Sequence, residues 1–311
     1  KASIRLGGVY TLVGLVDEWL SDEKTTSSPE ERHKEGQVII NNLCAYIRSP
    51  LPLAERAEQL DKDYAKDLQN DFDGDIEKFD ADKRAFARDK AALEEERQVR
   101  QSIIKEIREH LHNNKEPGPW SNFDYNFSNA YFFYPVDFNS SHFHKLLDFS
   151  AVNFNNGVDF SLASFSDSAK FSGATFDEEI EFSGTTFSVF ANFNGAIFSG
   201  WTRFSGATFQ WLADFNTATF AKEGTDFSNA NFQNVNFYQT IFSEYAIFRE
   251  TTFVQNATFA DTNFIKDANF TKAIFKNHAN FSDATFKGSI NFINATFTKD
   301  VEFSAAKFTG N

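Results

Sequence analysis

Residues 171–193 read FSGATFDEEIEFSGTTFSVFANF, in which phenylalanine recurs at 171, 176, 182, 187 and 193. The steps alternate between five and six residues, and this spacing continues, with one irregular stretch, from Phe138 to Phe308. A ring that returns at fixed intervals over such a length indicates a chain that winds around itself, with one ring at each inward position. The repeated positions are therefore predicted core positions, and this argues against catalysis in this part of the chain.

The irregular stretch indicates how many residues close one coil. Between Phe220 and Phe242 the steps are seven, five, five and five residues, and they add up to 22, the same total as two five-residue and two six-residue steps. A total that survives the irregularity predicts a coil of 22 residues with four Phe. A small residue stands two positions before most of these rings, as Ala174 and Ala191 do. A ring and a small partner together fill a narrow interior, and the Asn, Asp, Ser and Gly between them favour turns.

Segments such as ANFNGAIFSG (191–200) and ADFNTATF (213–220) resemble the pentapeptide-repeat family, in its Phe-rich variant with alternating steps. The resemblance covers roughly residues 122–311 and implies a right-handed, four-sided β-helix. The family's usual coil is shorter, so the extra residue on alternate sides implies that the four faces differ. We expect a mainly β solenoid over residues 127–311, with roughly eight coils and a length on the order of 40 Å.

Residues 1–116 lack this spacing and read as an α-helical domain. Apolar residues at helical intervals predict one helix in IRLGGVYTLVGLVDEWL (4–20). A second helix is predicted to begin near Ser28-Pro29 and to end before Pro50. A last helix, QVRQSIIKEIREHL (98–111), precedes a predicted linker at 117–126.

The charged stretch 53–95 reads as a helical insertion in this domain. Its apolar residues Phe72, Phe79, Phe86 and Leu93 recur every seven positions, which is typical of a short coiled coil or of a helix lying along a partner surface. Gly74 is expected to break the insertion into a hairpin, with residues 53–69 as one arm.

A second resemblance concerns the helical residues. RLGGVYTLVGLV (5–16), VIINNLCAYIR (38–48) and VRQSIIKEI (99–107) resemble the helical segment that precedes the repeats in bacterial membrane-tethered pentapeptide-repeat proteins. Two transmembrane helices precede this segment in that subfamily. The resemblance therefore implies a soluble part of a protein anchored at the cytoplasmic face of the bacterial inner membrane, with the anchor upstream of Lys1. The absence of methionine agrees with a missing start. The alternative is an ordinary helical cap on the β-helix, which needs no membrane.

Motifs that would carry chemistry are weak. The single cysteine, Cys44, lies in an apolar run and is expected to be a buried structural thiol. The segment 69–80 resembles an EF-hand loop, but Gln69 and Asp80 are the wrong residues for its first and last positions. His142 and His144 stand two apart, and on a strand such residues share a face. A solvated acidic turn and solvent-facing histidines are the alternatives. We expect no enzyme activity, no metal site and no cofactor.

The formal net charge is −14, which disfavours direct nucleic-acid binding, because phosphate contacts need a basic surface. Some members of the family that confer quinolone resistance resemble DNA in shape and charge and bind gyrase. The clearest acidic cluster here comprises Asp177, Glu178, Glu179 and Glu181. Imitation of DNA, with a topoisomerase such as gyrase as the partner, is therefore an alternative hypothesis. The simpler explanation is a surface that keeps the protein dispersed in water.

An apolar group stands outside the predicted rows of rings. Val189 and Phe190 follow Phe187, and Trp211 and Leu212 follow Phe209 at the same two places, one coil later. An apolar cluster on a polar rod is typical of an interaction site, and Trp is enriched at binding hot spots. The alternatives are that the six-residue step tucks these side chains against the wall, or that the Phe-rich insertion covers them.

We therefore expect a structural or protein-interaction module with an unknown protein partner. The last coil, an open edge, is a candidate site for a homodimer, although Lys299 and Lys307 on it could deter pairing.

Overall fold

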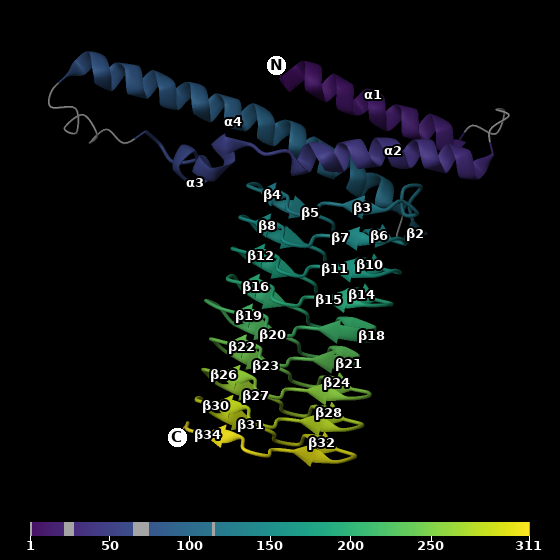
Figure 1. The fold of residues 1–311 in the computed structure, drawn as a ribbon, viewed down its shortest axis with the longest axis vertical. Coiled ribbons are helices and arrows are strands. Elements are labelled where there is room, and N and C mark those ends of the chain that lie inside the picture. The colour runs from purple at the N-terminus through teal and green to yellow at the C-terminus, as the bar shows by residue number, and fades with distance from the viewer. Residues whose placement is uncertain (1, 22–27, 65–74, 114–115, 311) are drawn as a thin grey trace.

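The computed structural model describes residues 2–21, 28–64, 75–113 and 116–310. A layer of helices lies across one end of a long solenoid, and α1 forms the side of that layer farthest from the solenoid (Figure 1). The helices are α1 (Ala2–Ser21), α2 (Pro29–Arg48), the 3₁₀ turn η1 (Pro52–Arg56), α3 (Ala57–Leu60) and α4 (Ile76–Leu111), and a two-stranded pair, β1 (His112–Asn113) and β2 (Glu116–Pro117), follows.

The first two helices form where the sequence predicts them. The Ser28 hydroxyl accepts a hydrogen bond from the Glu31 N–H, and the Glu31 carboxylate accepts one from the Ser28 N–H, so a capping box starts α2. Pro29 at the first helical position fits the same start, and Pro50 follows its end at Arg48. Both helices turn aliphatic residues inward, among them Val16 of α1, which is fully buried.

The predicted break between the insertion and the last helix is wrong. Helix α4 runs for 36 residues without interruption, because no Gly or Pro occurs between Ile76 and Leu111 and Asp75 caps its start by accepting from the Lys78 N–H. The opposite arm, predicted at 53–69, is helical only in η1 and α3 among its described residues. Phe72 and Gly74, which define the predicted turn, lie outside the described residues.

The seven-residue seam of α4 packs against this same chain. The rings of Phe79 and Phe86 lie with their centroids 5.8 and 5.2 Å from that of Tyr64, which follows α3. Leu93, the next residue of the seam, is buried. In the described residues the seam therefore closes a helical hairpin.

Three parallel sheets make the four faces of the solenoid, which we number in chain order from Phe187. The first and second faces share a 15-stranded sheet, the third is a nine-stranded sheet and the fourth an eight-stranded sheet. Each strand pairs with the strand one coil later, and the paired residues Phe165 and Phe187 are 22 positions apart. The prediction of a four-sided solenoid with 22-residue coils is confirmed.

The strands of the first and second faces are β3 (Tyr125–Asn126), β6 (His142–Phe143), β7 (Leu147–Asp148), β10 (Ser164–Phe165), β11 (Ala169–Lys170), β14 (Thr186–Phe187), β15 (Ala191–Asn192), β18 (Thr208–Asp214), β21 (Asn231–Asn236), β24 (Thr252–Phe253), β25 (Ala257–Thr258), β28 (Ile274–Phe275), β29 (Ala279–Asn280), β32 (Thr296–Phe297) and β33 (Val301–Glu302). Those of the third face are β4 (Tyr131–Phe132), β8 (Asn153–Phe154), β12 (Thr175–Phe176), β16 (Ile197–Phe198), β19 (Thr219–Phe220), β22 (Ile241–Phe242), β26 (Asn263–Phe264), β30 (Thr285–Phe286) and β34 (Lys307–Phe308). Those of the fourth face are β5 (Val136–Asp137), β9 (Val158–Asp159), β13 (Ile180–Glu181), β17 (Thr202–Arg203), β20 (Thr225–Asp226), β23 (Ala246–Ile247), β27 (Ala268–Asn269) and β31 (Ile290–Asn291).

Four columns of stacked phenylalanine rings fill the solenoid. In the column of the second face, Phe171 and Phe193 are 5.0 Å apart, and Phe193 and Phe215 are 4.8 Å apart, with nearly parallel rings. The small residues two positions before the rings, such as Ala174 and Ala191, are fully buried between the columns. Because these side chains are completely out of water, the columns account for the stability of the rod.

The corners made by five-residue steps turn through residues with positive φ. Glycine occupies this place at Gly173, Gly184, Gly195 and Gly206, with φ between 64° and 68°. In other coils the place is taken by Asn, Asp, Ser and, less favourably, by Leu162 with φ of 59°. The Ser-Gly pairs of the sequence therefore mark the tight corners of the coil.

Helix α2 covers the edge of the first coil, as the sequence predicts for the helical residues. The Gln37 amide donates to the Asp124 carbonyl and accepts from the Asp124 N–H, both at 2.8 Å, and so replaces a neighbouring strand. The Asn126 N–H points at Cys44, which is buried, and burial raises the pKa of that thiol to about 12. The predicted linker 117–126 is not a free connection, since Trp120 and Phe123 in it are fully buried under the helices.

Candidate interaction site

The apolar group predicted outside the columns lies on a β-bulge. In the pairing of β18 with β21, Phe209 faces Phe232 and Leu212 faces Asn234, so that Gln210 and Trp211 stand opposite the single residue between them. The six-residue step of β18 meets a five-residue step in β21, and this difference creates the bulge. A bulge turns a side chain out of the regular pleat, and the Trp211 side chain is 64% exposed.

We call Val189, Phe190, Trp211 and Leu212 the apolar corner, because they lie where the first face turns into the second. Val189 is 38% exposed, and Phe190 and Leu212 are partly exposed. The next two coils place Asn234 and then Gln255 at this corner, and Gln255 accepts a hydrogen bond from Asn277 one coil further on. The apolar side chains are therefore bordered by uncharged polar ones, which is the composition of a small protein interface.

The helical insertion does not cover the apolar corner. Residues 57–62 of the hairpin overhang the opposite corner, between the third and fourth faces, where they line a pocket of about 630 Å³ with Asn155, Asp177 and Lys222. The seam of the hairpin meets Tyr64 instead. Among the described residues, the interpretation that this seam shields Trp211 is wrong.

The acidic cluster is divided between a corner and a face. Asp177, Glu178 and Glu179 lie at the corner between the third and fourth faces, and Glu181 points outward from the fourth face. Arg203, one coil later, forms ion pairs with both Glu179 and Glu181, and its guanidinium also lies 5.8 Å from the Trp201 ring. These ion pairs neutralise part of the cluster.

A buried ionic network that the sequence analysis missed fastens the helices to the first coil. Arg100 is 2% exposed. It donates to the Glu96 carboxylate at 2.8 Å and to the carbonyls of Ile47 and Ser49 at 2.6 and 2.7 Å. Arg5 of α1 pairs with the same Glu96. Burial alone would raise the pKa of Glu96, but the hydrogen bond and charge of Arg100, with the charge of Arg5, lower it. One signal was available, since Arg100 occupies a helical position flanked by Val99 and Ile103.

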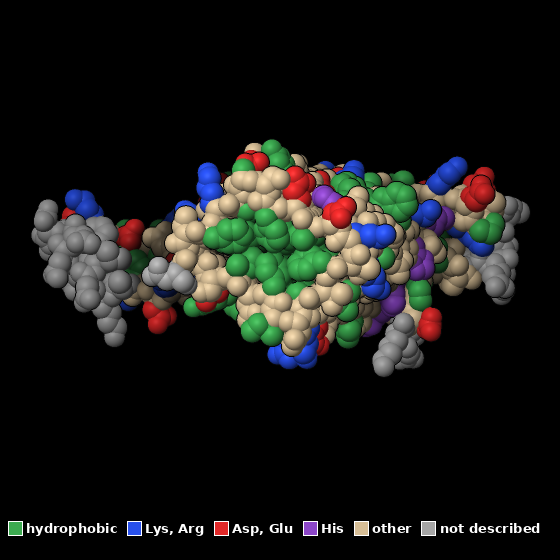
Figure 2. All heavy atoms as spheres, turned by 90° about the horizontal axis from the view of Figure 1, so that it is seen from below, with side chains coloured by type: hydrophobic (Ala, Val, Ile, Leu, Met, Phe, Trp, Pro, Cys, Tyr) green, Lys and Arg blue, Asp and Glu red, His purple; other side chains and the backbone are tan. Residues whose placement is uncertain are grey.

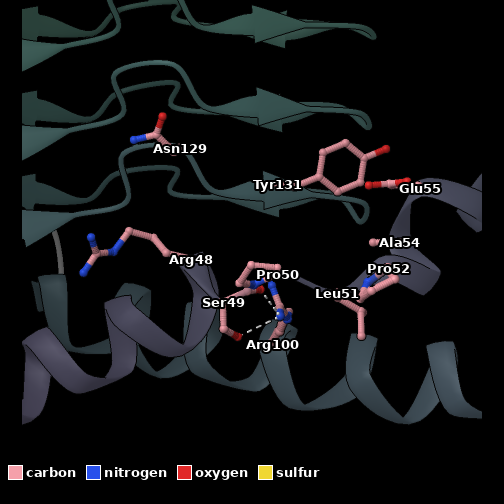
Figure 3. Close-up of a pocket in the computed structure, with 10 residues that line it drawn as sticks. All are labelled: Arg48, Ser49, Pro50, Leu51, Pro52, Ala54, Glu55, Arg100, Asn129 and Tyr131. Atoms are coloured by element: carbon pink, nitrogen blue, oxygen red, sulfur yellow. Dashed lines mark hydrogen bonds between the residues drawn. The ribbon is translucent and has the colours of Figure 1, made fainter.

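A pocket of about 260 Å³ lies beside this network, where α2 and η1 meet the first coil. Figure 3 shows Arg100 reaching Ser49 at its wall, with Tyr131 and Asn129 contributed by the solenoid. Every described bond of Arg100 goes to this protein's own atoms, so the guanidinium is engaged in holding α2. The pocket is therefore a packing seam of the helical layer.

The other predicted site residues carry no constellation for chemistry. His142 and His144 bond to Ser164 and Asn122, respectively. Of the EF-hand-like segment, Asp80 lies within α4, and Gln69 lies outside the described residues. Over the described ranges no group of three His, Cys, Asp or Glu side chains is placed to hold a metal ion.

The family comparison agrees with this geometry. The family model described as pentapeptide repeats (9 copies) matches residues 160–208, 204–252, 227–274 and 270–311. The solenoid belongs to the pentapeptide-repeat family. A search of the curated proteins and a search of the solved structures gave no match to the chain.

Pentapeptide-repeat solenoids are generally structural or interaction modules and generally lack catalytic activity. The arrangement of the rings explains why, because the positions that repeat are filled by packed Phe and Ala. Chemistry and recognition are left to the outward residues of the coils and to the helical layer. No helix in the described part of the chain combines the length and the apolar character needed to span a bilayer.

Proposed function

We propose that the chain is a non-catalytic protein-interaction module whose solenoid presents the apolar corner to a protein partner. The observation that carries the proposal is the position of Trp211, which a bulge turns outward and leaves 64% exposed on an otherwise regular wall. Exposed Trp in a small apolar group is costly to leave in water and is enriched at binding hot spots. The uncharged border favours a partner that offers apolar side chains rather than strong charge.

We further propose that the helical layer faces a membrane and that the solenoid points away from it, as the soluble cytoplasmic part of a tethered protein. Two features support this orientation. Helix α1 lies on the side of the layer opposite the solenoid (Figure 1). Its exposed residues between Ser3 and Gly14 are uncharged and include Ile4 and Tyr10, which are 74% and 51% exposed. An outer surface of this composition suits a lipid or apolar environment better than bulk water.

Imitation of DNA is the less favoured function. Along the fourth face the outward residues are Asp137, Asp159 and Glu181, but Arg203 follows them and pairs with the last of these. Lys170 interrupts the acids of the second face in the same way, after Asp148. DNA carries an uninterrupted row of negative charges, so the mixed rows of this solenoid favour the apolar corner as the recognition surface.

Affinity capture with the full-length gene product tests the proposal. Trp211→Ala combined with Phe190→Ser removes the apolar corner, and Ile274→Ala on β28 is the matched control, since it also truncates an exposed apolar side chain. We expect proteins that are retained by the parent and by the control to be lost from the double variant. An identical set of proteins on all three baits would overturn the assignment of the corner.

Cell fractionation tests the membrane orientation separately. The full-length product should sediment with membranes and, from inside-out vesicles, its solenoid should be open to added protease. Recovery of the full-length product in the supernatant would contradict the tethered arrangement without affecting the apolar corner.

A further inference from the structure

The two ends of the solenoid are built differently. Helices cover the first coil, whereas the last coil, residues 290–308, exposes its interior. Ile293, Val301 and Phe308 there are 62%, 38% and 57% exposed. Seen along the axis from this end, apolar side chains gather at the centre of the molecule within a polar frame (Figure 2). An open strand edge with an apolar centre favours pairing with another edge.

The backbone polarity of this edge can be read from the coil above it. On the second face, the N–H groups of Ala279 and Phe281 donate to the next coil at 3.1 and 2.7 Å. Val301 pairs with Ala279 one coil later, so the N–H groups of Val301 and Phe303 point out of the open end. The second face of the last coil therefore presents donors.

The third face has the opposite polarity. There the N–H groups of Lys307 and Thr309 donate back to the carbonyls of Ala284 and Phe286, both bonds being 2.8 to 2.9 Å long. The equivalent carbonyls of Ala306 and Phe308 consequently point out of the open end. The fourth face repeats the donors of the second, at Ile290 and Phe292, and the first face repeats the acceptors of the third, at Ala295 and Phe297. Donor and acceptor edges alternate around the coil.

We propose that two copies of this chain join end to end through their last coils, about a two-fold axis that passes through the corners at Ala305 and Asn294. This axis lays the second face of one copy against the third face of the other, in antiparallel direction. Donor edges then meet acceptor edges on all four sides. An axis through the middle of a face would instead set like edges on each other.

Charge selects this axis over the other diagonal. Glu302 points outward from the second face and Lys307 from the third, so the proposed axis places Glu302 of each copy beside Lys307 of the other. The other diagonal would place Glu302 beside Thr296, which is neutral. In the same register Phe308 lies over Val301, and Phe303 over Ala306, so that large side chains meet smaller ones. A contact limited to one coil is small, and such interfaces are reversible.

Sedimentation velocity of the 311-residue chain at rising concentration tests the proposal through a charge reversal. We expect a monomer–dimer equilibrium that Glu302→Lys or Lys307→Glu alone weakens at least about tenfold, since like charges across an interface are repulsive. The double reversal should restore the dimer. A monomer at all concentrations up to hundreds of micromolar, or a dimer indifferent to both single reversals, would overturn the proposal.

Cross-linking tests the position of the axis. Ala305→Cys places a thiol on the proposed axis, and Lys299→Cys, at the corner that the other diagonal would use, is the control. The native Cys44 is 1% exposed and does not compete. Mild oxidation should give a covalent dimer from the Ala305 variant at least about tenfold faster than from the Lys299 variant. Faster cross-linking of the Lys299 variant would reject this axis.

Discussion

Phe193 and Phe215, 22 residues apart, stack with their ring centroids 4.8 Å apart and their planes inclined by 3°. Each of these rings contacts the coil before it and the coil after it, and both are fully buried. The columns therefore couple neighbouring coils, and a change in one ring is felt on both sides of it.

Phe193→Ala is predicted to destabilise the solenoid strongly, by roughly 3–5 kcal/mol, because it leaves a cavity in a packed column. Phe308→Ala is the matched control, since that ring is already 57% exposed at the open end. Chemical unfolding of both variants measures the difference. A Phe193→Ala variant as stable as the parent would refute the packing of the columns.

Removal of residues 1–116 should yield an aggregating product. The deletion uncovers Trp120, Phe123 and Tyr125, all buried here, and frees the edge groups of Asp124 that Gln37 now satisfies. Light scattering of the 117–311 fragment is the measurement. A clean, monodisperse monomer would show that the helices are dispensable as a cap.

The Glu96–Arg100 network predicts a dependence of stability on pH. The pKa of Glu96 is lowered from its ordinary value of 4.5. The carboxylate therefore stabilises the fold fully above about pH 4.5, and this contribution is lost as the pH falls through the folded-state value. Glu96→Gln should show a smaller loss of unfolding free energy than the parent between neutral pH and the acid limit. Equal slopes in the two proteins would contradict the prediction.

Arg100→Ala should cost roughly 3–5 kcal/mol, because it leaves Glu96 buried without its main partner. Arg88→Ala on the exposed part of α4 is the control, since that side chain is 78% exposed. Denaturant unfolding followed by far-UV circular dichroism compares them. A cost for Arg100→Ala no greater than that of the control would mean that the network adds little.

Cys44 should be inert in the native state. Its thiol is buried, with the pKa raised to about 12, and only the thiolate reacts with disulfide reagents. Labelling with such a reagent at pH 8 should be slow in buffer and fast in denaturant. Rapid native labelling would show that α2 separates readily from the first coil.

The sequence was sufficient for the solenoid because its information is local and repeated. Every 22 residues the same alternation returns, so the register of one coil fixes the next, and even the compensating irregularity between Phe220 and Phe242 could be interpreted. The corner position of Trp211 followed from the same count. Its bulge did not, because a bulge depends on the step length of the paired strand as well as on its own.

The helical residues were harder to interpret. The capping residues Ser28 and Glu31 predicted the start of α2 correctly. The continuity of α4 was missed because the change in composition near residue 95 looked like a boundary, although no helix-breaking residue stands there. The pairing of Gln37 with Asp124 and of Arg5 with Glu96 joins residues 87 and 91 positions apart, and no periodic pattern connects them.

The central claim is that rings inside the columns hold the fold, whereas the apolar corner is free for a partner. The most direct measurement is the free energy of unfolding of Trp211→Ala combined with Phe190→Ser, beside that of Phe193→Ala. We predict that the double variant lies within about 1 kcal/mol of the parent, as surface substitutions usually do, while Phe193→Ala falls well below it. A double variant that loses as much stability as Phe193→Ala would show that the corner is part of the core.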